Sequence, residues 1–291
     1  MTGMPAEIDG GLKLAHKKRY SVEQLNLFNT PYNDIYEAIS ARGYVPGSHV
    51  VMLVCDTSAQ DDVDRQALVD AFETLNGGHV YVGEVEEFTY AIIFSNGPRD
   101  YISLSYLHIM PTLESLIHEP FGLLCGTSQA FEDLRGCDSA FKQCLYALEY
   151  REYYVRELNI MREPIDIRII PGAAFEQVLP YYLVEESSTD DAFVNFCLSQ
   201  AFLTTILADD IRHNTKNFQI LWFYLAYECN ASVVGRRMFM HRNSVLYHLK
   251  QLENRYDFDL SRRHFREKLL LDYRMVFMNL SEASLKTLFD D

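Results

Sequence analysis

The chain has 291 residues, of which 48% are hydrophobic and 23% are charged. These are ordinary globular values, so they exclude a disordered chain and a fibre, and the length predicts two or three domains. The formal net charge of −15 makes the chain, taken as a whole, a poor ligand for polyanions.

The charge is unevenly distributed along the chain. Residues 1–215 contain 14 Lys and Arg against 32 Asp and Glu, a net charge of −18. Residues 216–274, which we name the basic segment, contain 11 against 6, a net charge of +5. The last 17 residues contain 1 against 3, a net charge of −2. A basic segment beside an acidic remainder predicts that one face of the protein binds an anion.

The six cysteines form neither a Cys-x-x-Cys pair nor a Cys/His cluster with zinc-ligand spacing, so no metal site or cofactor is expected. They are interpreted as buried, reduced thiols. The most apolar long stretch, residues 192–208, is too short and too polar to span a bilayer and predicts a buried helix. The first 19 residues lack the apolar core of a signal peptide. We therefore expect a soluble cytoplasmic protein without a membrane partner.

Residues 1–47 form a predicted helical extension that ends at Gly43 and Pro46-Gly47. Within it, Ser21 begins a capping sequence and residues 31–41 form a second helix. No function is assigned to this extension.

Residues 48–160 alternate between strand-like and helix-like patterns. Strands are predicted at 48–55, 79–83, 89–94 and 121–128, with helices at 61–75, 101–117 and 139–157. The order is βαββαβ followed by the last helix, a split βαβ arrangement with helices on one face of the sheet. The fold class is α+β, with this ferredoxin-like domain followed by an all-α region.

Residues 161–215 are predicted to be a connector and a helical region. Its first part contains Pro164, Pro171 and Pro180, and an acidic loop follows at 185–191. From there the pattern is helical as far as Leu280.

The strongest motif lies in the C-terminal domain, residues 216–291. An amphipathic helix at 217–229 precedes a short helix at 231–238, a three-residue turn at 239–241 and a longer helix at 243–256. A short helix, a tight turn and a longer second helix form a helix-turn-helix.

The longer helix has two distinct faces at about 100° per residue. Val245, Leu249 and Leu252 share one narrow sector, which predicts contact with the core. The opposite sector and its flanks carry groups that can bind base edges or phosphates. Those residues are Asn243, Ser244, Tyr247, Lys250, Gln251 and Asn254. A trihelical module that binds a protein remains the alternative.

The stretch His241-Arg-Asn-Ser-Val-Leu-Tyr-His-Leu249 resembles the HRNTLRYRL signature of PucR/CdaR-type bacterial transcription regulators. The similarity extends over roughly residues 192–280. It implies a DNA-binding helix-turn-helix. Leu246 and His248 stand where that signature has arginines, and Gly235 stands where alanine is usual. Losing two cations should weaken phosphate binding and lower its salt dependence.

A cluster of cations at the start of the last helix offers a compensation. Arg262, Arg263, His264 and Arg266 lie where the helix dipole disfavours positive charge, so their placement needs a reason. Phosphate contact is one reason, and ion pairing with the acidic N-terminal part of the chain is the other.

The βαββαβ region resembles the degenerate GGDEF-like domain that precedes the DNA-binding domain in the same family. Glu84 and Val85 replace the two glycines of the nucleotide-cyclase signature, and their side chains should block a nucleotide. Asp56 stands where a cyclase carries a metal ligand, but a turn-forming role is the preferred interpretation. No other catalytic motif is found, so an enzyme is not expected.

The resemblance and the motif together predict a sequence-specific transcriptional regulator that binds double-stranded DNA as a homodimer and responds to a small-molecule effector. The predicted DNA-binding residues are Arg242, Asn243, Ser244, Tyr247, Lys250, Gln251, Arg262, Arg263 and Arg266. Two alternatives stay open. One is a regulator that binds a protein and keeps the helix-turn-helix as a scaffold, and the other is an enzyme built on the βαββαβ domain.

Overall fold

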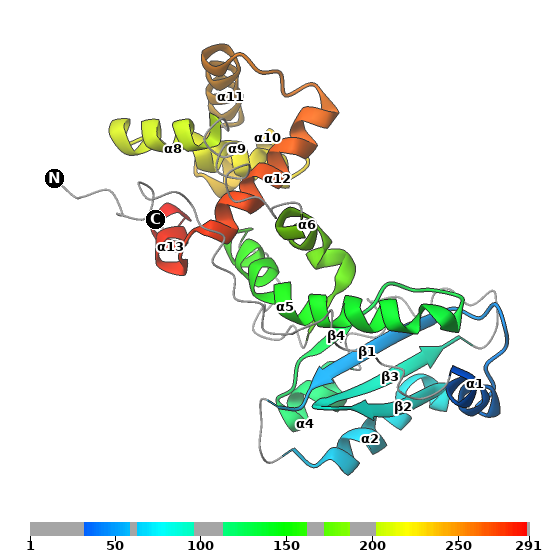
Figure 1. The fold of residues 1–291 in the computed structure, drawn as a ribbon. Helices are drawn as coiled ribbons and strands as arrows, with labels where there is room; N and C mark the ends of the chain where they lie inside the picture. The colour runs from blue at the N-terminus through cyan, green and yellow to red at the C-terminus, as the bar shows by residue number, and fades with distance from the viewer. Residues whose placement is uncertain (1–31, 59–62, 96–112, 162–171, 187–201, 290–291) are drawn as a thin grey trace. The chain divides into compact units, whose positions relative to one another are not determined.

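The computed structural model describes residues 32–58, 63–95, 113–161, 172–186 and 202–289 (Figure 1). The described residues form two compact units, and the boundary between them falls between residues 179 and 180. We describe each unit by itself.

The first unit contains the predicted βαββαβ order. Strand β1 (Val50–Asp56) leads to α2 (Arg65–Glu73), and a hairpin of β2 (Val80–Val85) and β3 (Phe88–Phe94) follows. The series closes with β4 (Cys125–Thr127) and α5 (Cys137–Met161). The strands lie in the order β2-β3-β1-β4-β5, and β1 is antiparallel to both β3 and β4. This mixed sheet confirms the α+β expectation.

The fifth strand, β5 (Gly172–Ala174), pairs with β4 in parallel, in a stretch that the sequence pattern assigns to a connector. Three small residues carry no strand signal of their own. Their size permits the pairing, because a Cβ atom on Gly172 would lie 1.7 Å from the carbonyl oxygen of Cys125. The strand therefore exists because β4 offers it a partner edge.

Helices cover both faces of the sheet, so the expectation of helices on one face is wrong. Every residue of β1 and β3 is buried. One face packs with α1 (Tyr32–Ala41) and α5, and the other packs with α2 and the segment around Leu113 and Ile117. The cause is visible in β1, where apolar side chains occupy both alternating sets of positions.

Several predicted boundaries differ in the structure. The predicted helix at 101–117 falls largely outside the described residues, and its end is a short π-helical segment at Glu114–His118. Phe121 lies in the short helix α4 (Glu119–Phe121), not in a strand. Short 3₁₀ turns occur at Leu75–Gly78 and Leu134–Gly136. The predicted capping sequence at Ser21 lies outside the described residues.

Four of the cysteines are buried and free in the sheet unit, as expected. Burial raises the pKa of the Cys55 and Cys144 thiols well above the ordinary value, and raises that of Cys137 to about 12. Cys125 is likewise buried, and Cys229 in the helical unit is half-buried. Cys197 lies outside the described residues.

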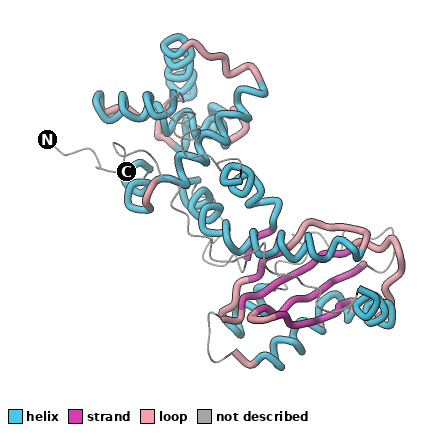
Figure 2. Tube along the Cα trace, in the orientation of Figure 1, coloured by secondary structure: helices cyan, strands magenta, loops and turns pink. Residues whose placement is uncertain are grey.

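The described residues of the second unit form helices joined by turns and loops (Figure 2). Its helices are α8 (Phe202–His213), α9 (Asn217–Ala226), α10 (Ala231–Arg237), α11 (Arg242–Tyr256), α12 (Arg263–Asn279) and α13 (Glu282–Phe289), and α6 (Phe175–Glu186) leads into it. The predicted buried helix at 192–208 is described only from Phe202 onward. Among the helices that the structure describes, none is both long and apolar enough to cross a membrane.

The core of the helical unit is aromatic. Trp222 of α9 lies with its ring 5.2 Å from Tyr273 and 4.9 Å from Phe277 of α12. Phe289 of α13 packs on Phe277 and on Phe218. Offset and edge-to-face rings of this kind stabilise a core beyond their buried area. This cluster fixes α9 as the central helix on which the helix-turn-helix is built.

Candidate nucleic-acid interface

The helix-turn-helix begins with local caps on both of its helices. The Asn230 side chain accepts hydrogen bonds from the backbone N–H groups of Ser232 and Val233, at 3.1 and 3.3 Å, and so starts α10. The ring Nδ1 of His241 accepts from the N–H of Asn243 at 3.2 Å and starts α11. The predicted turn at 239–241 is therefore confirmed, with each neighbouring helix beginning within one residue of its expected start.

Close backbone contact joins the two helices of the motif. The backbone N–H of Met240 donates to the carbonyl oxygen of Gly235 at 2.8 Å. A Cβ atom added to Gly235 would lie 2.7 Å from the Met240 carbonyl oxygen, which is closer than real Cβ contacts. Glycine at this position therefore lets the turn lie directly against α10.

The turn itself contains a residue that sequence reasoning did not single out. Phe239 has a φ of 53°, in the left-handed region that disfavours a bulky side chain, and its side chain is 94% exposed. Both properties are unusual for phenylalanine. The available signal was an aromatic residue at a turn position where glycine or asparagine is the ordinary choice.

The two predicted faces of α11 are confirmed. Val245, Leu249 and Leu252 are at most 4% exposed and pack into the helical unit. The predicted contact residues on this helix are all exposed, namely Arg242, Asn243, Ser244, Tyr247, Lys250 and Gln251. The solvent side of α11 is therefore mainly polar, and Leu246 is an exposed apolar residue on it.

Several predicted phosphate-binding cations have acidic partners close by in the sequence. Lys250 Nζ lies 3.3 Å from Glu253, Arg262 lies 3.3 Å from Asp259, and Arg263 lies 2.7 Å from Glu267. The two arginine pairs are exposed, and such pairs contribute little to stability and exchange readily with other anions. Glu253 is half-buried and also accepts from the backbone N–H of Leu260 at 2.8 Å, so the Lys250 pair is held more firmly. Each cation and its acidic partner lie within four residues of each other in the sequence.

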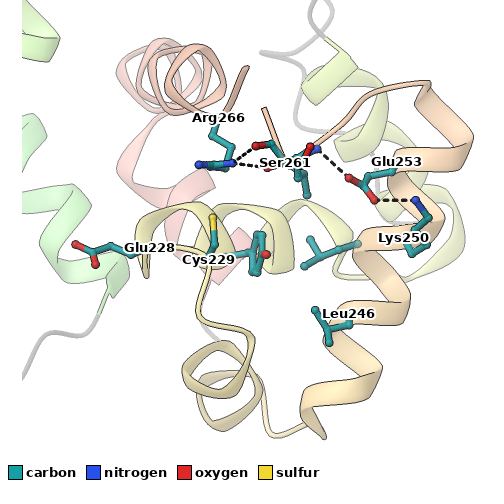
Figure 3. Close-up of a pocket in the computed structure, with 10 residues that line it drawn as sticks. Glu228, Cys229, Leu246, Lys250, Glu253, Ser261 and Arg266 are labelled. Carbon is teal, nitrogen blue, oxygen red and sulfur yellow. Dashed lines mark hydrogen bonds and ion pairs between the residues drawn. The ribbon is translucent and has the colours of Figure 1, made fainter. Parts of the chain in front are cut away.

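Arg266 is held differently. Its Nη1 donates to the carbonyl oxygens of Leu260 and Ser261, at 2.6 and 2.9 Å, and the residue is half-buried (Figure 3). Both carbonyls belong to the loop between α11 and α12. Arg266 thus closes this loop, and its guanidinium is already bound at the place where a phosphate contact was expected.

Two exposed arginines of the helix-turn-helix remain, counting only the described residues 231–256. The side chains of Arg236, at the end of α10, and Arg242, at the start of α11, are exposed, and neither has a partner within the described part of the chain. Arg236 was not among the predicted contact residues, because a basic residue in the last turn of a helix is common. The two flank the turn at 239–241, so positive charge lies on both sides of Phe239.

The two positions where the signature has arginines have different surroundings. Leu246 is 38% exposed on the edge of the polar surface. His248 is half-buried, and its Nδ1 lies 3.1 Å from Oδ1 of Asn217, the first residue of α9. His248 therefore joins two helices inside the unit, whereas Leu246 places an apolar group at the surface.

The end of α11 is tied to α8 through Asp209. Tyr256 donates its hydroxyl to Asp209 Oδ2 at 2.7 Å, and Arg255 forms an ion pair with the same oxygen at 2.7 Å. The Tyr256 hydrogen bond, followed by the Arg255 charge, lowers the pKa of Asp209, while burial and this carboxylate raise the pKa of Tyr256 to about 12. These contacts orient α11 on the rest of the unit.

The neighbouring carboxylate of Asp210 orders the start of α9. It is buried, it accepts from Asn217 Nδ2 at 3.0 Å, and it accepts from the backbone N–H of Phe218 at 2.6 Å. A carboxylate at a helix N-terminus satisfies free N–H groups and favours the dipole. The adjacent acids Asp209 and Asp210 thus hold α11 and the start of α9 in place.

A depression of about 620 Å³ lies between α9, α11 and the loop before α12 (Figure 3). Leu246, Lys250 and Glu253 line it from α11, and Cys229 and Arg266 line it from the other sides. It is wide open to solvent and its lining mixes apolar groups with both signs of charge. Its position beside Lys250 makes it an extension of the exposed α11 surface.

In the sheet unit, the residues aligned with the nucleotide-cyclase signature have structural roles. Asp56 accepts from the backbone N–H and the hydroxyl of Ser58, at 2.9 and 2.6 Å, so its side chain forms the turn after β1. The ring of Tyr90 covers Gly83, at 2.4 Å from an added Cβ position. Glu84 and Val85 lie in β2 and pair with β3. The described residues hold no group of three His, Cys, Asp or Glu side chains able to bind a metal.

These features define the class of protein as a helix-turn-helix protein with an exposed polar second helix. Residues 218–275 match the PucR C-terminal helix-turn-helix domain, and this part of the chain belongs to that family. The chain is therefore classed among transcriptional regulators.

The solved structures that are similar to the chain include one that matches most of its length. A regulator of polyketide synthase expression from Bifidobacterium adolescentis is similar over 89% of this chain and 93% of that chain, at 14% identity with a TM-score of 0.33. A likeness of this size supports no conclusion about fold or function. No curated protein matches the chain.

Proposed function

We propose that this regulator binds double-stranded DNA sequence-specifically, with α11 in the major groove. The observation that carries the proposal is the exposed polar face of α11, opposite the buried Val245, Leu249 and Leu252. A helix presented in this way, behind a tight turn, has the shape that the major groove admits.

The contacts fall into two groups. Asn243, Ser244, Tyr247 and Gln251 lie near base edges, while Arg242 and Lys250 bind phosphates. Arg262 and Arg263 contribute phosphate contacts by exchanging their exposed carboxylate partners for the backbone of the duplex. Arg236 joins this group because its exposed side chain lies in the last turn of α10, next to the turn of the motif. Arg266 supports the loop instead of the DNA.

One helix-turn-helix reads a single half-site, so the active form is a homodimer on an inverted repeat. The proposed domains are a helical extension at 1–47, a degenerate GGDEF-like domain at 48–160, a connector and helical region at 161–215 and the DNA-binding domain at 216–291. The GGDEF-like domain responds to a small-molecule effector or a second subunit and does not act as a cyclase. The covered Gly83 and the turn-forming Asp56 support this role.

Selection of bound duplexes from a random DNA pool tests the proposal. The expected result is an enriched inverted repeat whose binding constant falls with salt at a log–log slope of several units. A folded protein that enriches no duplex at low salt, with or without candidate effectors, would contradict it. Incubation with GTP and Mg²⁺ tests the sheet domain separately, and formation of a cyclic dinucleotide would overturn its assignment.

A second candidate function is supported by the ion pairs. Lys250, Arg262 and Arg263 already have acidic partners, and the net charge of the chain is −15. A regulator that binds another protein through α11 fits these facts as well. Lys250→Glu separates the two, because the charge reversal should abolish DNA binding but leave a neutral protein contact intact.

A further inference from the structure

Apolar side chains are concentrated at the proposed reading surface. Of the seven large hydrophobic side chains that are exposed among the described residues, three lie within the nine residues from 239 to 247. They are Phe239 at 94%, Leu246 at 38% and Tyr247 at 63% exposure. We name these three residues the apolar cluster because they lie close together in the sequence, on the turn and the first half of the helix that is proposed to enter the groove.

The backbone at Phe239 supports a contact role for this cluster. Its φ of 53° is unfavourable for phenylalanine, and nothing in the described structure covers the ring in return. Strained residues of this kind persist at binding sites more often than elsewhere. The ring therefore projects into solvent from the turn that precedes α11.

The polar groups around the cluster favour particular bases. Asn243 and Gln251 carry amides, which pair with the N6 and N7 atoms of adenine. Guanine is read chiefly by arginine and lysine. On α11 the only arginines are Arg242 and Arg255, and Arg255 is engaged with Asp209. Lys250 is paired with Glu253. Since the proposed function assigns Arg242 and Lys250 to phosphates, the amides of Asn243 and Gln251 are the groups left to read bases, and they favour adenine over guanine.

Resting on the proposed function, we propose that the half-site is A·T-rich and that Leu246 and Phe239 read it through the 5-methyl groups of thymine. Thymine is the base that presents an apolar group in the major groove, and aliphatic or aromatic side chains contact it. The net charge of +5 on the basic segment attracts it to DNA. Arg236 and Arg242, on either side of the turn, contact phosphates at the edge of the groove that Phe239 enters.

Uracil tests this directly, because it differs from thymine only by lacking that methyl group. Each thymine of the selected half-site is replaced singly by deoxyuridine, and the dissociation constant of the full-length protein is measured at one salt concentration. At one or two positions, we expect about fourfold weaker binding, as for the loss of one buried methyl group. Replacements outside the half-site should have no effect.

Protein variants then assign each methyl group. Leu246→Ala should weaken binding to the thymine duplex and abolish the response to uracil at one position. Phe239→Asn should do the same at another position, since asparagine tolerates the left-handed backbone. Leu271→Ala is the matched control, because Leu271 is 40% exposed on α12. Circular dichroism confirms that each variant is folded. In such a cycle, coupling between a base and a side chain indicates contact.

Each outcome is decisive. Enriched half-sites rich in G·C pairs, or variants that weaken thymine and uracil duplexes by the same factor, overturn the inference but leave DNA binding in place. A change of sedimentation mass in Leu246→Ala, without a change in uracil response, overturns it as well and assigns the cluster to a second copy of the chain. No enrichment of any duplex removes the proposed function and this inference together.

Discussion

Arg266 Nη1 donates a 2.6 Å hydrogen bond to the carbonyl oxygen of Leu260, so a residue expected to bind phosphate also closes the loop between α11 and α12. A second bond reaches the Ser261 carbonyl at 2.9 Å. Arg266→Ala should therefore lower the free energy of unfolding by about 1–3 kcal/mol, because two carbonyls lose a charged donor. Urea denaturation measures the loss. A variant with unchanged stability but weaker DNA binding would return Arg266 to the phosphate-binding group.

Arg242 has the opposite expected behaviour. Its side chain is exposed and has no partner within the described ranges, so Arg242→Ala should leave the unfolding midpoint unchanged. If Arg242 neutralises one phosphate, the slope of log binding constant against log salt should fall by about 1. Arg263→Ala is an informative comparison, because its existing pair with Glu267 should make its effect on binding smaller. An Arg242 variant with the parental slope would argue against a phosphate contact.

Gly235→Ala tests the contact between the two helices of the motif. The added Cβ would lie 2.7 Å from the backbone oxygen of Met240, and a backbone atom cannot move aside cheaply. The strain should outweigh the better helix propensity of alanine and destabilise the unit by about 1–3 kcal/mol. Thermal unfolding measures the change. Ser232→Ala on the same helix is the control, and a Gly235→Ala variant more stable than the parent would show that the turn can shift.

Phe239→Asn tests the strain in the turn. Asparagine accepts the observed φ of 53° better than phenylalanine, and little burial is lost because the ring is 94% exposed. The variant should be at least as stable as the parent, by up to about 1 kcal/mol, while its DNA binding weakens. Chemical denaturation and binding are measured on the same sample. A loss of stability would mean that the ring packs on something in solution.

Tyr256→Phe tests the tie between α11 and α8. The Tyr256 hydroxyl lowers the pKa of Asp209, so this contribution to stability is present above the unfolded value of 3.8 and is lost as pH falls through the folded value. Tyr256 itself has its pKa raised from 10.0 to about 12, so its contribution is complete below pH 10 and is lost between those values. The stability difference between parent and variant should therefore be flat near neutral pH and shrink at both extremes. If the stability difference between parent and variant stays constant below the ordinary pKa of Asp209, the hydrogen bond between Tyr256 and Asp209 does not contribute to stability.

The sequence by itself predicted the helix-turn-helix, because its signals are local. Val245, Leu249 and Leu252 repeat at helical spacing, and Asn230 is a strong cap. Both the core face and the exposed face of α11 follow from that repeat. The βαββαβ order was predicted for the same reason, since each long strand carries its own apolar run.

Only the tertiary structure decided how these elements are used. Strand β5 depends on a partner edge at β4, and the covering of both sheet faces depends on which helices pack there. The role of Arg266 depends on two carbonyls five and six residues away, and that of His248 depends on Asn217 in another helix. Periodicity reports which side of an element is buried, but a hydrogen-bond partner is set by where the chain returns in space. The sequence therefore located the helix proposed to read DNA. It did not distinguish the cations that already have a partner in the protein from those that have none.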